Sequence, residues 1–313
     1  IIRKYNSLLQ KIKDIEGKLE KGVFQKIFAM CAVEIEASLI PPAREKALIN
    51  AMFSVYNQRV VLATKDVDEK EKELQLYIAC HKTLFKWDEH MVRFLLFSLY
   101  YPEWKNPNNE LILRLANNVN TILAEIDKQL EHPWQKQIMR TLSKKKIMFW
   151  IIQDIIAENP DGASAIFSDP ELLESEVKKA ANKRYKGVRV KLRRGVVRSI
   201  IYVFFTKMAL ALAIEFPMDL YLAGAINYTA GTINILFPPV LMFLVAIMIR
   251  MPKKENTKKI VEEVNAIVFN PAEGEKYKLK YPHRRGMIVN AIFHIIYSFT
   301  FVFSLMVIFY LLN

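Results

Sequence analysis

Cysteine and glycine are scarce in this chain of 313 residues, and each scarcity excludes a class of protein. The two cysteines, Cys31 and Cys80, lie in apolar helical contexts without paired spacing, so we predict reduced core residues and no disulfide framework. Nine glycines leave few places for a phosphate-binding loop, and no glycine-rich nucleotide motif is present. A nucleotide-dependent enzyme is therefore not indicated.

Catalytic and metal-binding motifs are also missing. The five histidines form no pair at i, i+4 with a glutamate between them, and no G-x-S-x-G elbow is present. Cys80, His81, Asp88 and His90 lie close in sequence, but their spacing matches no common metal site. The sequence nominates no catalytic residue, no metal and no cofactor, and it favours a function other than catalysis.

Runs of alternating polar and apolar residues bounded by turn residues are absent from residues 1–176, so an all-α structure is predicted there. Pro41-Pro42 separates two helical segments, because proline suits a first turn and not a helix interior. Helix-capping side chains are expected at the starts of several helices: Asp66 or Asp68, Asp88, Asn108, and Asp169 followed by Pro170.

The first helix carries an apolar seam with alternating steps of four and three residues. Its members are Ile1, Tyr5, Leu8, Ile12, Ile15 and Leu19. A seam shorter than three heptads fits an amphipathic helix packed on its own domain, and it also fits a coiled-coil partner. Because the chain opens on Ile1 already in register, we expect further sequence upstream.

A second apolar segment, residues 147–156, follows Lys144, Lys145 and Lys146. It is too short to cross a bilayer. Two interpretations remain open: a buried core helix, or a helix lying at the lipid surface with Trp150 at the boundary.

Charge is divided unevenly along the chain. Residues 1–176 hold 24 Lys and Arg against 25 Asp and Glu, whereas residues 177–313 hold 21 against 7. Between residues 178 and 198 there are ten basic side chains and no acidic one. Because this run directly precedes an apolar segment, it indicates anionic lipid rather than nucleic acid as the partner. The predicted headgroup-binding residues are Lys183, Arg184, Lys186, Arg189, Lys191, Arg193, Arg194 and Arg198.

Three apolar segments follow, at residues 196–216, 228–249 and 287–312. Each can cross a bilayer, since about 20 helical residues cover about 30 Å. The turn between the first two carries Asp219 and no Lys or Arg, whereas residues 250–286, expected to form a loop, carry ten Lys and Arg. The positive-inside rule then places the N-terminal region and this loop in the cytoplasm and the C-terminus on the opposite side. A two-span version, with the first segment in the interface, is the rival topology.

Polar residues within these spans are the candidate site. Lys207 lies near the middle of the first span, where an unpaired lysine is costly, so we expect it to find acceptors. Pro238 and Pro239 free main-chain carbonyls of the second span, including that of Asn234, which we expect Lys207 to reach. Further candidates lie in the third span: His294, Ser298 and Thr300. A lysine that is merely tolerated, or that extends toward the interface, is the alternative.

The predicted fold is thus all-α: a cytoplasmic helical bundle (1–176, with a coiled-coil-like helix at 1–20), a basic juxtamembrane helix (177–195) and a three-helix membrane domain (196–313). We expect a membrane-anchored, non-enzymatic adaptor or assembly subunit that binds a protein partner, or a second copy, through its cytoplasmic helices. The alternative function is a component of a transport or membrane-insertion machine that uses Lys207 and the proline-broken span.

Overall fold

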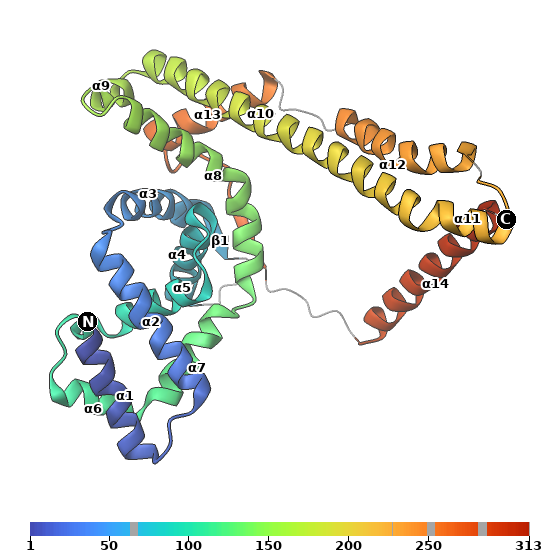
Figure 1. Cartoon of the computed structure of the whole chain (residues 1–313). Helices are drawn as coiled ribbons and strands as arrows, with labels where there is room; N and C mark the ends of the chain where they lie inside the picture. Colours follow the sequence, from blue (N-terminus) through green and yellow to red (C-terminus); the bar gives the residue numbers. More distant parts are fainter. Residues whose placement is uncertain (63–67, 227, 249–253, 281–286, 313) are drawn as a thin grey trace. The chain divides into compact units, whose positions relative to one another are not determined.

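A computed structural model describes residues 1–62, 68–226, 228–248, 254–280 and 287–312 (Figure 1). Helices dominate these residues, as the sequence predicted. Predicted caps open four of them: Asp68, Asp88, Asn108 and Asp169 each accept a hydrogen bond from a main-chain N–H of the first turn. Asp66, the other candidate, lies outside the described residues.

The chain divides into two compact units, one of residues 1–144 and 276–313 and one of residues 145–275. This division differs from the boundary at residue 176 expected from charge. The elements of the first unit are α1 (Ile2–Glu16), α2 (Lys21–Leu39), α3 (Ala43–Arg59), β1 (Val60–Leu62), α4 (Glu69–Phe85), α5 (Glu89–Tyr100), η1 (Pro102–Lys105), α6 (Asn109–Asn117), α7 (Val119–Leu130), the start of α8 (Trp134–Glu158), β2 (Tyr277–Leu279) and α14 (Met287–Leu312).

The apolar seam of the first helix packs inside its own unit. Tyr5, Leu8 and Ile12 are buried in a core shared with α2, α5, α6 and α7. Ile1 and Ile15, at the ends of the seam, are exposed. The middle of the seam therefore packs against other helices of the same chain, which favours the interpretation as an amphipathic helix. Cys31 and Cys80 are free and buried, which confirms that part of the prediction.

Two strands correct the expectation of helices alone in the N-terminal region. Val60–Leu62 pairs in parallel with Tyr277–Leu279, and Val60 lies opposite Tyr277. Each strand has three residues, too few for the period-two pattern that identifies strands in a sequence. The pairing joins the segment just before α14 to the N-terminal helices.

The second unit is built from the end of α8, α9 (Ala163–Ser168), α10 (Pro170–Leu210), η2 (Ala211–Glu215, a π-helical turn), α11 (Phe216–Ala223), α12 (Tyr228–Met248) and α13 (Lys254–Phe269). Its core contains buried apolar residues of α8, α10 and α13. Phe149, Ile151 and Ile155 are buried there, so residues 147–156 form a core helix and do not lie on lipid.

Residues 250–286, expected to be a loop, contain α13 and β2, although residues 249–253 and 281–286 lie outside the described residues. The sequence signal for α13 is weak because its first turns are dominated by charged and polar residues, and its apolar residues gather in its second half. Ile260 and Val264 are buried.

The basic juxtamembrane helix and the first predicted span are parts of one helix, α10, which runs for 41 residues, or about 62 Å. The turn expected over residues 217–227 begins later than Pro217. A π-helical turn ends two residues before Pro217, which lacks the N–H that would bond the carbonyl four residues back. The helix continues to Ala223 and ends at Gly224, whose φ of 70° is the left-handed conformation that glycine adopts readily.

Candidate functional site

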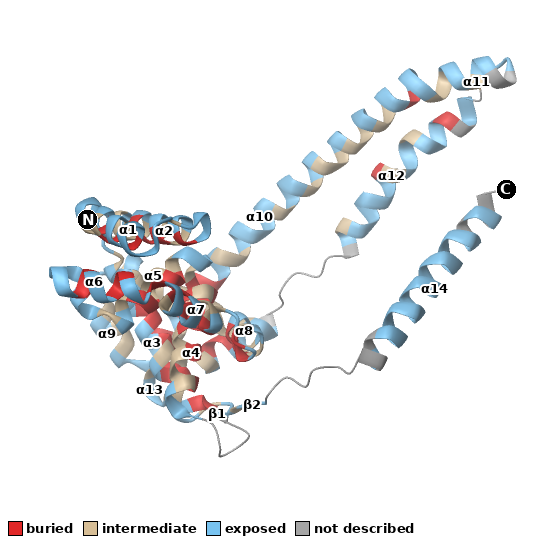
Figure 2. Ribbon diagram, turned by 90° about the horizontal axis from the view of Figure 1, so that it is seen from below, coloured by how far each residue is buried: buried red, intermediate tan, exposed pale blue. Residues whose placement is uncertain are grey.

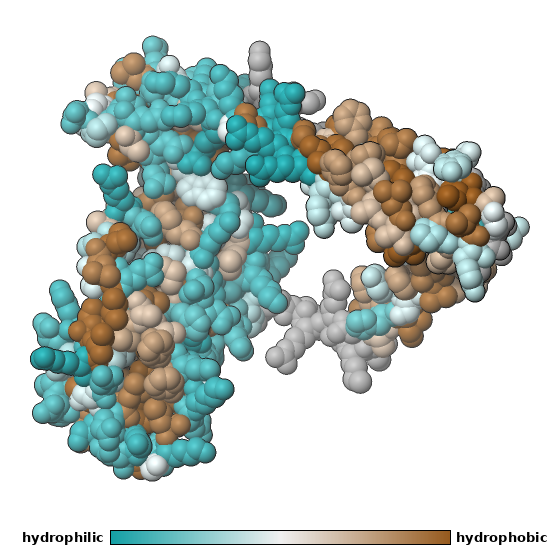
Figure 3. Space-filling model, in the orientation of Figure 1, coloured by the Kyte–Doolittle hydropathy of each residue, from teal (hydrophilic) through white to brown (hydrophobic). Residues whose placement is uncertain are grey.

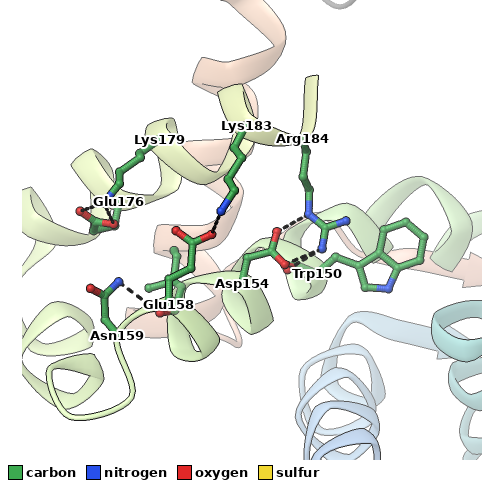
Figure 4. Close-up of polar contacts among 9 residues, drawn as sticks. Trp150, Asp154, Glu158, Asn159, Glu176, Lys179, Lys183 and Arg184 are labelled. Atoms are coloured by element: carbon green, nitrogen blue, oxygen red, sulfur yellow. Dashed lines mark hydrogen bonds and ion pairs between the residues drawn. The ribbon is translucent and has the colours of Figure 1, made fainter. Parts of the chain in front are cut away.

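The base of α10 is fastened to α8 by a guanidinium–carboxylate pair (Figure 4). Arg184 Nε donates to Asp154 Oδ2 at 2.5 Å, and its Nη2 donates to Asp154 Oδ1 at 2.9 Å. The same Nη2 donates to the main-chain carbonyl of Trp150 at 3.1 Å. Trp150 also lies beside two cations, with Lys146 Nζ 4.9 Å and Arg184 Cζ 5.4 Å from the ring centre. This two-bond geometry fixes the angle at which α10 leaves α8.

A second ion pair lies beside it. Lys183 Nζ donates to Glu158 Oε1 at 2.6 Å. That hydrogen bond lowers the pKa of the Glu158 carboxyl and raises the pKa of the Lys183 ammonium. Lys183 and Arg184 were both predicted to bind lipid headgroups, but the structure gives each a carboxylate on α8. Sequence reasoning missed Asp154 and Glu158, which lie one turn apart on the face of α8 toward α10.

The other six predicted headgroup-binding residues are exposed. Within the described part of the chain, none of them has an ion pair or a hydrogen-bonded partner. They are Lys186, Arg189, Lys191, Arg193, Arg194 and Arg198, called here the basic collar. Because successive helical residues turn by about 100°, three of them face one side of α10 and three another. The collar thus surrounds the helix instead of lining one face.

Beyond the collar, the continuous helix Pro170–Tyr221, made of α10, η2 and most of α11, is long and apolar enough to cross a membrane, with a mean hydropathy of 1.7 in its most apolar window. Only 6% of that window is buried within the described residues. Figure 3 shows apolar side chains covering this part of α10 and α12, and hydrophilic ones where the collar begins. Among the described residues, Gly231–Ile247 and Ala291–Val307 are shorter apolar stretches at the second and third predicted spans. Ile249, the end of the second predicted span, lies outside the described residues.

α12 folds back along α10 as an antiparallel hairpin (Figures 1 and 2). Asn234 Nδ2 on α12 donates to Glu215 Oε1 at 2.7 Å, which sets the register of the two helices. Counting about 14 residues from Asn234 to Met248, and as many back from Glu215, reaches Ile201. The end of α12 is therefore level with the part of α10 that directly follows the collar.

Small and aromatic residues pack the far end of the hairpin. Ala211 is fully buried, and Gly231 is so close to the Phe216 ring that a Cβ added there would lie 2.6 Å from a ring carbon. Phe216 also contacts Tyr228 edge-on, with ring centres 6.3 Å apart. Glycine at 231 thus permits the close approach of α12 to the π-helical turn.

The expected bond from Lys207 to the freed main-chain carbonyls of α12 stays a prediction. Asn234 is level with Glu215, eight residues or about 12 Å along α10 from Lys207, and its side chain is bonded to Glu215. Within the described residues, no ion pair or hydrogen bond involves the Lys207 ammonium. Pro238 and Pro239 do lie inside α12, as expected.

The remaining candidates lie on α14, which belongs to the other compact unit. Thr300 Oγ1 donates to the main-chain carbonyl of Ile296 within α14 itself. His294 and Ser298 are exposed. Their pairing with Lys207 therefore stays a prediction.

The N-terminal unit has a separate cavity of about 530 Å³ between α2, the start of α3 and α5. Its lining combines apolar side chains, among them Trp87, Met91 and Phe94, with Arg44 and Lys46. Behind Trp87 lies His81, fully buried, with ring centres 4.1 Å apart. Burial, and then the nearby Lys46 charge, lower the pKa of His81 to about 4, so this histidine is neutral near pH 7.

No group of three or more His, Cys, Asp or Glu among the described residues could hold a metal ion. No protein-family model, curated protein or solved structure matches the chain. Its function must therefore be inferred from these residues and their geometry.

Proposed function

We propose that this chain is an integral membrane, non-enzymatic adaptor or assembly subunit, anchored by the α10–α12 hairpin and by α14. One observation carries the proposal: a single helix, α10, is fastened into a helical base at one end and exposes an apolar surface at the other. Water disfavours so large an exposed apolar surface, whereas lipid covers it without cost.

The charges of the hairpin support one orientation. Asn256 Nδ2 on α13 donates to the Tyr185 hydroxyl on α10 at 2.7 Å, so the segments on either side of the hairpin meet at the same end. That end also carries the collar, and basic residues stay on the cytoplasmic side. The N-terminal region is then cytoplasmic, the hairpin crosses twice, and α14 crosses a third time to leave the C-terminus outside.

Aromatic side chains support the same boundaries. Tyr202 lies just past the collar and is 71% exposed, whereas Tyr221 and Tyr228 lie at the hairpin's far end. Tyr202 and Tyr221 are separated by about 28 Å along the helix, close to the thickness of a hydrocarbon core. Tyrosine favours both membrane interfaces. The collar is then level with anionic headgroups, each basic residue contributing about 1 kcal/mol to lipid binding.

The adaptor role rests on the surface of the N-terminal unit. α2 is apolar on two faces: Ile27 and Met30 are in the core, whereas Phe24, Phe28 and Leu39 are exposed. Phe24 and Phe28 stack on each other with ring centres 5.9 Å apart. An exposed apolar helix face of this kind is typical of a surface that binds another protein.

Co-purification from native membranes tests the adaptor role. The unchanged chain and a Phe24→Ser/Phe28→Ser variant are compared by quantitative mass spectrometry, with Leu113→Ser on α6 as a matched exposed-apolar control. We expect one protein in stoichiometric amounts with the unchanged chain and the control, and a loss of about tenfold with the α2 variant. Equal recovery from all three, or no stoichiometric protein, contradicts the role.

A second function, membership of a transport or insertion machine, is favoured by one observation: Glu215 and Asn234 form a polar pair within the apolar hairpin. Polar groups in such positions commonly mark substrate or ion pathways. A Glu215→Gln/Asn234→Leu variant that keeps its partner but loses a transport or insertion activity in cells would support this function over the adaptor.

A further inference from the structure

The hairpin contains a carboxyl group, Glu215, with apolar residues on either side of it in the sequence, and Asp219 lies one turn further along the helix. Glu215 is half-buried, and its Oε1 accepts from Asn234 Nδ2 at 2.7 Å. Its neighbours on the helix, Ala213, Ile214 and Phe216, are apolar. An ionised carboxylate is costly in such surroundings unless a cation or a proton accompanies it.

The position of this pair along the hairpin places it inside the hydrocarbon, if the hairpin crosses the bilayer as proposed. Asn234 is about 21 Å from the last described residue of α12, Met248, and about 9 Å from the first, Tyr228. These distances add up to the thickness of a bilayer core of about 30 Å. Water therefore does not solvate the Glu215 carboxyl as it would at the surface.

The internal cation of the hairpin does not neutralise this carboxyl. Lys207 lies on the same helix about 12 Å away, beyond the reach of an ion pair. In the described part of the hairpin, Asn234 is the only group that an observed hydrogen bond connects to Glu215, and an amide carries no charge. The balancing charge must come from outside the hairpin.

The turn of α12 that is bonded to Glu215 also carries main-chain oxygens without helical partners. Pro238 and Pro239 have no N–H, so the main-chain carbonyls of Asn234 and Ile235 lose their helical partners. Asn234 thus contributes a side-chain oxygen and a freed carbonyl from the turn of α12 that contacts Glu215. Carboxylate, amide and carbonyl oxygens are the ligands that hard cations prefer.

The local backbone is also irregular at this point. Ala211–Glu215 is a π-helical turn, which inserts one residue into the helix and ends on the carboxyl-bearing residue. Such turns are rare in proteins and occur frequently at functional sites. Its fully buried Ala211 shows that the turn is packed and is not a frayed end.

We propose that Glu215 and Asn234 form a binding site for one small monovalent cation, a proton or Na⁺, within the membrane hairpin. The carboxyl holds the proton directly, or its oxygens and those of Asn234 ligate Na⁺. The inference rests on the membrane placement proposed above. Because the Glu215–Asn234 hydrogen bond connects α10 and α12, binding of an ion at these two residues affects how the helices pack.

A hydrophobic fluorescent carbodiimide tests the site, because it reacts with protonated carboxyls from within lipid. The full-length protein is reconstituted into vesicles, and insertion is checked by resistance to alkaline extraction. Labelling is then mapped by mass spectrometry between about pH 6 and pH 9. We expect Glu215 to be labelled, and labelling to weaken as the pH rises, because the reagent reacts only with a carboxyl that carries a proton. Glu262, exposed on α13, should stay unlabelled, and Glu215→Gln should show no label in this peptide.

Added Na⁺ distinguishes the two ligands. Slower labelling in NaCl than in choline chloride at one pH assigns Na⁺, and Asn234→Leu should then reduce this protection at least about threefold. Labelling that depends on pH alone assigns the proton. An inserted protein whose Glu215 is unlabelled, or is labelled independently of both pH and Na⁺, overturns the site. A protein removed by alkaline extraction contradicts the membrane placement itself.

Discussion

Arg184 and Lys183 differ from the basic residues that follow them because their partners lie on another helix, α8. Charge counting treats Lys183, Arg184 and the basic collar alike, since all are cations in one run. The fold separates them: Arg184 meets Asp154 and Trp150, Lys183 meets Glu158, and the collar stays exposed. The basic residues of this run therefore have two roles. Lys183 and Arg184 hold α10 to α8, whereas the basic collar remains available to bind lipid headgroups.

Removing the Asp154 carboxylate tests the first group. Asp154→Asn keeps the shape but loses the charge-assisted pair with Arg184, which is about one third exposed on both sides. We expect a loss of about 1–2 kcal/mol in the free energy of unfolding, measured by denaturation in detergent. Lys183→Ala, whose side chain is 71% exposed, should cost clearly less. Equal losses in the two variants would contradict the assignment.

His81 makes stability depend on pH. Burial and the Lys46 charge hold its folded pKa at about 4, below its ordinary value of 6.5, so the unfolded chain binds the proton more readily. Stability is complete above about pH 6.5 and falls by about 3 kcal/mol as the pH approaches 4. Urea denaturation followed by tryptophan fluorescence should show this slope. His81→Phe should flatten it, whereas His90→Phe, at an exposed position, should not.

Local signals were predictable from the sequence, and pairings between helices were not. Asp68, Asp88, Asn108 and Asp169 cap helices as expected, because a cap bonds residues two or three positions away. The partner of Asn234 depends on the register of α12 against α10, which no short pattern encodes. The hydrogen bond between Glu215 and Asn234 was therefore not predicted.

α10 shows the same contrast at the scale of an element. The sequence indicated a basic helix and an apolar span, but not that they form one uninterrupted helix of 41 residues. Gly187 and Gly195 lower helix propensity without breaking the helix. One helix therefore runs from the contacts with α8 into the hairpin. The hairpin in turn depends on how closely α12 approaches α10.

Gly231 tests that approach. A valine at this position meets the Phe216 ring, so Gly231→Val should separate α12 from the π-helical turn and lower the thermal stability of the protein in detergent. Phe216→Ala in the same chain removes the obstructing ring. We expect the double variant to recover part of the loss, an interaction of about 1 kcal/mol in a double-mutant cycle. Strictly additive losses would show that the two residues do not pack together.

The whole molecule combines a helical N-terminal unit with apolar helices that the described protein surface does not cover. Charge placement, the tyrosines at both ends of the hairpin and the shared base of α10 and α13 all favour one arrangement in a membrane. In this arrangement the hairpin enters and leaves the bilayer on the same side, where the basic collar lies. Because both native cysteines are buried, a single cysteine introduced at an exposed position would be the thiol that a labelling reagent reaches.

Labelling of single engineered cysteines with a membrane-impermeant maleimide in sealed vesicles measures this most directly. Ser164→Cys on α9 and Lys258→Cys on α13 probe the base, and Ala225→Cys probes the turn at the far end of the hairpin. We expect Ser164→Cys and Lys258→Cys to be labelled from one face of the membrane and Ala225→Cys only from the other. Labelling of all three from the same face would contradict this arrangement.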